Sequence, residues 1–184
     1  MFYLNSYEQC DNSTLQDEEY LHEIYQKYVS LLNPNSGITS SIWETPQDIS
    51  ADDLVDFCAF NDLLHQKNAN DEYESGNIYA RAELVEAALL QYFNDISPEY
   101  LRTSRWYEYN EIPGRDNKNK YIMMMGGGGG LIKVLSAEKD GDILNIVVGL
   151  YVGDDTDNVE KAFMLSLKLE ESGFKYLSYT EYLA

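Results

Sequence analysis

The chain is poor in the residue types that most readily mark a catalytic or disulfide-bonded protein. Its 184 residues include two cysteines, two histidines and four prolines. Cys10 and Cys58 form neither a CxxC pair nor a disulfide framework. His22 and His65 lie far apart without a second ligand at metal-binding spacing, so we expect no metal site and no cofactor. The scarcity of histidine also removes the commonest general base, although carboxylates can replace it.

Motifs for nucleophiles and for phosphate binding are also missing. There is no GxSxG sequence, and the SxxK at Ser136 falls at a predicted strand end instead of a helix start. The run Gly126–Gly130 leads into Leu131-Ile132-Lys133-Val134, which predicts a strand, whereas a phosphate-binding loop needs a helix there. We interpret the run as a bulge or wide bend, with a ligand-facing backbone as the alternative. The acidic stretch 153–158 fails the EF-hand pattern and predicts a solvated turn, with a calcium site of another kind as the alternative.

Basic side chains are scarce relative to acidic ones. The chain has 13 lysines and arginines and 32 aspartates and glutamates, which gives a net charge of −19. Residues 1–92 hold 17 acidic and 3 basic residues, a net charge of −14, and residues 93–184 hold the other −5. Such a field repels nucleic acids and anionic membrane surfaces, so we expect no direct nucleic-acid binding, while a basic protein partner stays open. No apolar run approaches the ~20 residues of a membrane span.

Helix signals dominate the first part of the chain. Ser13 with Gln16, Ser50 with Asp53, and Ser97-Pro98 resemble helix starts. Apolar spacing predicts helices over 13–32, 50–64, 79–93 and 97–102, a loop over 33–49 anchored by Trp43, and an exposed linker over 65–77.

Strand signals take over after Ser104. Alternating apolar residues predict strands over 106–112, 120–125, 131–138, 142–151, 163–169 and 174–182. Asp140-Gly141 is a strong hairpin signal, and the short turns indicate antiparallel pairing.

These patterns predict an α+β fold in one domain, residues 1–184. We expect a loose N-terminal arm (1–12), a mainly helical part (13–104) and an antiparallel meander sheet of five to six strands (105–184). The helices should pack on one face of that sheet. A cystatin-like or nuclear-transport-factor-like roll is one form of this arrangement.

Aromatic residues are abundant, with 16 tyrosines. Trp106, Tyr107 and Tyr109 fall on one predicted strand, and Arg102 and Arg105 stand beside them. Tyrosine offers a rigid contact area with a polar tip, which suits protein or carbohydrate recognition. Two alternatives stay open: the rings line the core edge, and the basic residues balance the acidic helices within the fold.

Three functional hypotheses follow, and the sequence favours a protein that is not an enzyme. The first is a binding module that presents the surface formed by Trp106, Tyr107, Tyr109, Arg102 and Arg105 to a protein or polysaccharide. The second is an acidic mimic of nucleic acid that inhibits a DNA-binding protein, which needs rows of carboxylates on one face. The third is a carboxylate-based enzyme with a sheet-lined pocket. The oligomeric state is left open.

A set of local motifs links the second half of the chain to a family. The motifs are Leu84-Val85-Glu86, Tyr92-Phe93, the run from Ser97 to Arg102, Tyr107, Tyr121, the glycine run and Asp140-Gly141-Asp142. Over about residues 80–184 this pattern resembles uncharacterised proteins of Gram-positive bacteria, many of them similar to secreted proteins or lipoproteins. The resemblance implies no functional residues. It implies an extracytoplasmic setting over a cytoplasmic one, although the chain shows no signal peptide.

Overall fold

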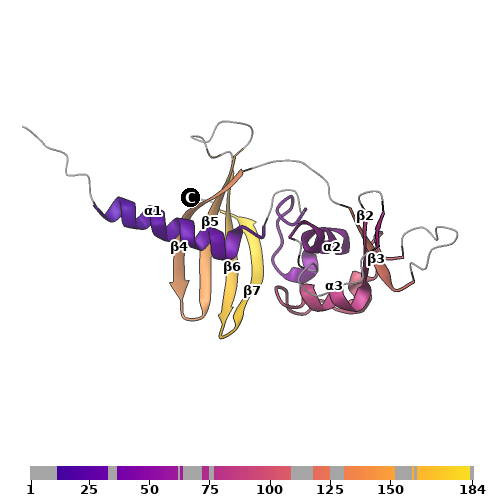
Figure 1. Ribbon diagram of the computed structural model, residues 1–184. Helices are drawn as coiled ribbons and strands as arrows, with labels where there is room; N and C mark the ends of the chain where they lie inside the picture. The colour runs from indigo at the N-terminus through magenta and orange to yellow at the C-terminus, as the bar shows by residue number, and fades with distance from the viewer. Residues whose placement is uncertain are drawn as a thin grey trace, which may run out of the picture.

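Helices lead the chain and long strands follow (Figure 1). The computed structural model describes residues 12–32, 37–61, 63, 72–74, 77–108, 118–124, 131–151, 159 and 161–182. The helical elements are α1 (Asn12–Ile24) with a π-helical continuation (Tyr25–Val29), a 3-10 turn (Pro46–Asp48), α2 (Ala51–Phe60), α3 (Ala82–Leu89) and α4 (Pro98–Leu101). The strands are β1 (Glu72–Glu74), β2 (Asn77–Arg81), β3 (Lys120–Met124), β4 (Leu131–Asp140), β5 (Ile143–Tyr151), β6 (Lys161–Glu170) and β7 (Gly173–Glu181). The expected α+β class is confirmed.

The last four strands form an antiparallel meander in the order β4-β5-β6-β7. The turn between β4 and β5 contains Gly141 at φ +62°, the left-handed conformation that the Asp-Gly signal predicts. Along β5, Leu144, Ile146 and Val148 are buried on one face, as period-two alternation requires. The strands predicted from 131 onward are therefore confirmed.

A second sheet, in the order β1-β2-β3, corrects two predictions. Residues 72–74 and 77–81 are strands, where we expected part of the 65–77 linker and the start of the 79–93 helix. Tyr79 and Ala80 are buried, and Ala80 pairs with Tyr121 of β3. Arg81 keeps an extended backbone, so α3 begins only at Ala82. Pairing with a strand far along the chain overrides the local helical pattern here.

The strand expected over 106–112 is not formed in its described part. Trp106 to Glu108 is a turn joined to β3 by a single bridge between Tyr107 and Tyr121. Glu108 has φ +49°, which interrupts an extended backbone. The meander accordingly has four strands, because β3 belongs to the other sheet. The cystatin-like or nuclear-transport-factor-like roll stays a prediction.

The helices take two positions relative to the meander (Figure 1). α1 crosses one face of the four-stranded sheet at β4, while α2 and α3 lie with the three-stranded sheet at its β7 side. One buried cluster joins these parts: the ring of Phe57 on α2 lies 5.2 Å from Phe93, which lies 5.4 Å from Tyr176 of β7. The outer edge of β7 is thereby covered by the helical part of the chain.

The loop after α1 is anchored by Trp43, as predicted. Its side chain is 2% exposed, and its Nε1 donates a hydrogen bond to the carbonyl of Ile38 at 3.1 Å. The backbones of Trp43 and Tyr179 exchange two hydrogen bonds of 2.8 Å, which ties this loop to β7. Several features that the sequence singled out lie outside the described residues: residues 1–11 of the predicted arm, among them Cys10, and also His65, Tyr109, the run Gly126–Gly130 and the stretch 153–158.

Candidate functional site

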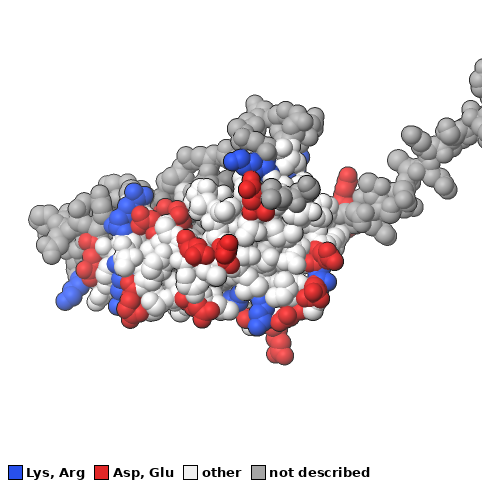
Figure 2. All heavy atoms as spheres, turned by 180° about the vertical axis from the view of Figure 1, so that it is seen from behind, with Lys and Arg blue, Asp and Glu red and all other residues white. Residues whose placement is uncertain are grey.

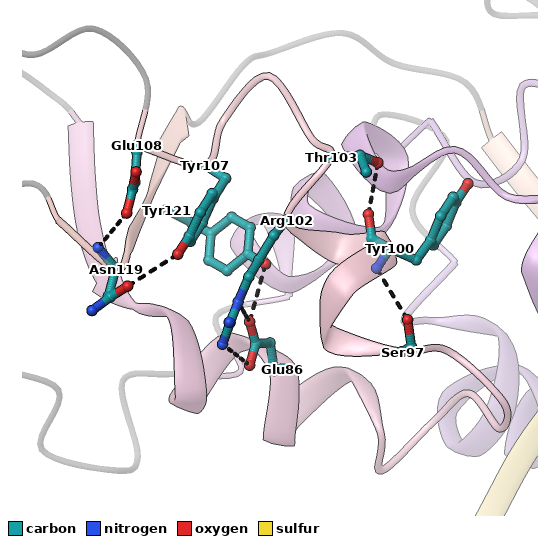
Figure 3. Close-up of polar contacts among 9 residues, drawn as sticks. All are labelled: Glu86, Ser97, Tyr100, Arg102, Thr103, Tyr107, Glu108, Asn119 and Tyr121. Carbon is teal, nitrogen blue, oxygen red and sulfur yellow. Dashed lines mark hydrogen bonds and ion pairs between the residues drawn. The ribbon is translucent and has the colours of Figure 1, made fainter.

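The site begins at α4, a single helical turn whose ends are fixed by side chains. The Ser97 hydroxyl accepts a hydrogen bond from the Tyr100 amide at 3.1 Å, and Pro98 occupies the first helical position. The Thr103 hydroxyl donates to the Tyr100 carbonyl at 2.7 Å (Figure 3). These contacts hold Arg102, the C-cap residue, in a defined position.

Arg102 is bound to a buried carboxylate on α3 (Figure 3). Its Nε donates to Glu86 Oε1 at 2.8 Å and its Nη2 donates to Oε2 at 3.1 Å, a bidentate pair. The Glu86 side chain is 8% exposed, whereas that of Arg102 is 42% exposed. The hydrogen bond to Glu86 raises the pKa of the Arg102 guanidinium. A carboxylate below the surface thus fixes a cation at the surface.

Two tyrosines complete this network. The buried Tyr121 hydroxyl donates to Glu86 Oε1 at 3.4 Å, and burial, then the Glu86 charge, raises the pKa of that hydroxyl. The Arg102 guanidinium lies 5.8 Å from the ring centroid of Tyr107, which lies 5.1 Å from the Tyr121 ring. Tyr107 is half-buried, and its hydroxyl donates to Asn119 Oδ1 at 3.1 Å. We call Glu86, Arg102, Tyr107, Asn119 and Tyr121 the Arg102 network.

Arg105 forms a second arginine–aromatic contact. Its guanidinium lies 4.3 Å from the ring centroid of Trp106, and its Nε lies 3.2 Å from Asp52 Oδ2 on α2. Asp52 Oδ1 also accepts hydrogen bonds from the Ser104 hydroxyl at 2.8 Å and the Arg105 amide at 2.9 Å. Further along α2, burial and the neighbouring Asp53 charge raise the pKa of Asp56 to about 6.

The structure brings together some of the predicted site residues and buries another. Arg102 and Tyr107 are in contact, as are Arg105 and Trp106. Trp106, expected on a recognition surface, is only 8% exposed and belongs to the core. Arg105 lies over its ring, so the indole contributes to packing and offers little contact area. Tyr109 lies outside the described residues. The surface is therefore formed by arginine and tyrosine, without the tryptophan.

Sequence reasoning missed the acidic partner that positions Arg102. Glu86 lies four residues after buried Ala82 and three before buried Leu89, within the apolar stripe of α3. An acidic residue inside such a stripe needs a cationic or hydrogen-bonding partner, because an isolated buried charge is costly. The position of Glu86 in the stripe was therefore the signal that this residue has a partner. The identity of the partner was not readable, since Arg102 lies on another element.

Two cavities in the described part of the chain lie away from the Arg102 network. One, of about 370 Å³, lies between α1 and β4. The other, of about 420 Å³, lies beside Tyr92 and Phe174. Among the described residues, no three His, Cys, Asp or Glu side chains are grouped as metal ligands. The same residues include no helix of the length and apolarity that a bilayer span requires.

Comparisons of the chain with protein-family models, with curated proteins and with solved structures gave no match. The resemblance over residues 80–184 to Gram-positive secreted proteins and lipoproteins therefore stays a prediction.

Proposed function

We propose that the chain is a protein-binding module, not an enzyme, and that its recognition surface is centred on Arg102 and Tyr107. The observation behind this proposal is the bidentate pair between a surface arginine and a buried carboxylate, Glu86, beside a half-buried tyrosine ring. Arginine and tyrosine are enriched among the residues that contribute most to protein interfaces. A side chain that is already fixed loses less conformational entropy when a partner binds.

The charge of the chain favours a partner with a net positive charge. At −19, the chain attracts such a protein over several ångströms and repels an acidic one. At contact, the exposed N–H groups of the Arg102 guanidinium suit carbonyl or carboxylate groups of the partner, whereas the Tyr107 hydroxyl, which donates its proton to Asn119, offers an acceptor. The proposed partner is thus basic overall and presents hydrogen-bond acceptors to this surface.

The other two hypotheses receive less support. A nucleic-acid mimic needs carboxylates in rows, whereas the face in Figure 2 has them in small separate groups beside a broad uncharged area. A carboxylate enzyme needs paired acids in a pocket. Asp56, with its raised pKa, lines neither the cavity between α1 and β4 nor the one beside Tyr92 and Phe174.

The test compares partner capture by matched variants of the full chain. Arg102→Ala and Tyr107→Ala remove the proposed contacts, and Arg81→Ala is the control, because Arg81 is also an exposed arginine paired with an acid, Glu83, at 3.1 Å. Each protein is immobilised and exposed to extracts, and captured proteins are quantified by mass spectrometry after circular dichroism has verified folding.

We expect a basic protein to be captured by the wild type and by Arg81→Ala, and at least tenfold less by the other two variants, since anchor residues contribute about 2 kcal/mol or more. Capture that is equal for all three variants would contradict the proposal. The ion pair with Glu86 would then serve only to join α3 to α4.

A further inference from the structure

Among the residues that the structure describes, the four-stranded sheet has one covered edge and one open edge. At β7, the backbone of Trp43 pairs with Tyr179, and the Tyr176 amide donates to the Tyr92 carbonyl at 2.8 Å. At the other edge, β4 pairs with β5 alone among the described strands. An open strand of ten residues presents a row of backbone donors and acceptors to which another strand can add.

α1 extends past this open edge. Figure 1 shows it crossing β4 and continuing beyond the outer side of the sheet. The cavity of about 370 Å³ lies where the two elements meet, lined by Glu18, Leu21, His22, Tyr25 and residues 131–134. The four β4 residues of this lining are consecutive and lie at the start of the strand. A strand added to β4 would lie beneath the overhanging part of α1.

A bulge in β4 decides which residues share a face. The register shifts between Val134 and Ser136, so that Lys133 pairs with Gly149 and Glu138 with Asn145. Gly149 and Asn145 are four residues apart on a regular strand and face the same side, and hence so do Lys133 and Glu138. The direction of backbone N–H and C=O groups alternates together with the side chains. Lys133, before the bulge, and Glu138, after it, therefore point their backbone N–H and C=O groups toward the same edge of β4.

We propose that a second copy of this chain adds to β4, with the two β4 strands antiparallel about a two-fold axis between Leu135 and Ser136. In this register Lys133 of each copy faces Glu138 of the other, and Val134 faces Ala137. Because the bulge shifts the register, both members of each pair lie on one face of the sheet. An isologous contact of this kind contains every pair twice and closes as a dimer.

The charges of β4 favour a second copy as the occupant. The strand contains two basic residues, Lys133 and Lys139, and two acidic ones, Glu138 and Asp140. Its net charge is therefore zero, although that of the chain is −19. Two copies can thus approach here without the repulsion that their acidic parts would produce elsewhere. Bulges and edge lysines discourage indiscriminate strand addition. In a self-complementary strand, the same bulge and lysines favour one register of pairing over the others.

The cavity provides a place for a further contact. In the proposed register, Lys139 of the partner copy lies opposite Ile132, on the face that α1 covers. Its aliphatic stem would lie along the apolar lining of the cavity, with the ammonium near the exposed Glu18. Lys133 already lies 4.9 Å from the Tyr151 ring centroid, and Glu138 of the partner would add a carboxylate to that contact.

The test is a charge exchange, read out by the oligomeric state of the full chain. Sedimentation equilibrium measures the dimer dissociation constant of the wild type, Lys133→Glu, Glu138→Lys and the double variant. Each single variant places like charges opposite each other twice, and we expect it to raise the constant about tenfold. The double variant restores both pairs and should return within about threefold of the wild type.

The controls are Lys168→Glu and Glu170→Lys, exposed residues of β6 that change the net charge by the same amounts. They should leave the dissociation constant unchanged. A wild type that is monomeric at every soluble concentration overturns the proposal. A dimer that responds equally to the β4 variants and the β6 controls overturns it too, because the contact would then lie elsewhere. The outcome is independent of Arg102, which lies on another element.

Discussion

Two buried tyrosines of β7 provide a sharp test of the packing between this strand and the rest of the fold. Tyr176 and Tyr179 are both 0% exposed. The Tyr176 hydroxyl donates to the carbonyl of Tyr28 at 2.7 Å, which joins β7 to the helical segment that follows α1. The Tyr179 hydroxyl has no hydrogen-bond partner among the described residues. Removing the hydroxyl of Tyr176 and removing that of Tyr179 should therefore have different effects on the free energy of unfolding.

Tyr176→Phe loses a hydrogen bond and leaves the buried Tyr28 carbonyl unpaired. The unpaired group costs about 1–3 kcal/mol, so we expect the free energy of unfolding to fall by about 2 kcal/mol. For a chain of this size that corresponds to a decrease in Tm of about 4–8 °C. Tyr179→Phe keeps the stacking on Phe163, whose ring centroid is 4.7 Å away, and removes a buried polar atom. We expect a change between zero and about 1 kcal/mol in the stabilising direction.

Urea unfolding, followed by circular dichroism, measures both differences on the full chain, and calorimetry supplies Tm. The slope with urea should be the same for the three proteins, because the surface exposed on unfolding hardly changes. If Tyr179→Phe costs as much as Tyr176→Phe, the hydrogen bond to Tyr28 is not what distinguishes the two positions.

Two further predictions concern α2 and the turn before it. The raised pKa of Asp56 means that its contribution to stability is present below its unfolded pKa of about 3.8 and is lost as the pH rises through about 6. Asp56→Asn should thus raise the free energy of unfolding at pH 7.5 by about 1 kcal/mol, after allowance for the half-exposed carboxyl, and leave it unchanged at pH 3.5. Thermal melts at the two pH values measure this difference, since Tm should rise at pH 7.5 alone. Gly37 has φ +76°, and a Cβ there would overlap the Asp53 carboxylate, whereas Gly141 at φ +62° has open space around it. Urea unfolding should give a cost of about 2–4 kcal/mol for Gly37→Ala and about 1 kcal/mol for Gly141→Ala, and equal costs would contradict the overlap.

Local signals in the sequence predicted the elements that depend on neighbouring residues. The hydroxyl of Ser50 does accept a hydrogen bond from the Asp53 amide, and Ser97-Pro98 does begin a helical turn. The hairpin at Asp140-Gly141 also formed as predicted. Each of these depends on contacts within a few residues, for which type and spacing are sufficient information.

The sequence pattern did not predict which distant segments pair with each other. The stretch at Tyr79 has apolar spacing compatible with a helix, and its pairing with β1 and β3 makes it a strand. The three-stranded sheet depends on that contact between distant segments, and a one-dimensional pattern does not contain it. Trp106 illustrates the same limit for the site: its neighbours predicted an alternating strand, whereas the indole packs in the core and is 8% exposed, with Arg105 over its ring.

The arrangement of the two arginines limits how a partner can use them. Each already pairs with an acidic residue of the N-terminal half, Arg102 with Glu86 and Arg105 with Asp52, so part of the −14 charge of that half is balanced within the fold. A partner's carboxylate that displaced Glu86 would leave a buried charge without its cation, at a cost of several kcal/mol. A partner therefore gains more by adding an acceptor to the exposed part of the Arg102 guanidinium than by replacing its pair. Arg102→Lys, which keeps the charge and loses the bidentate geometry, should for that reason weaken partner binding almost as much as Arg102→Ala.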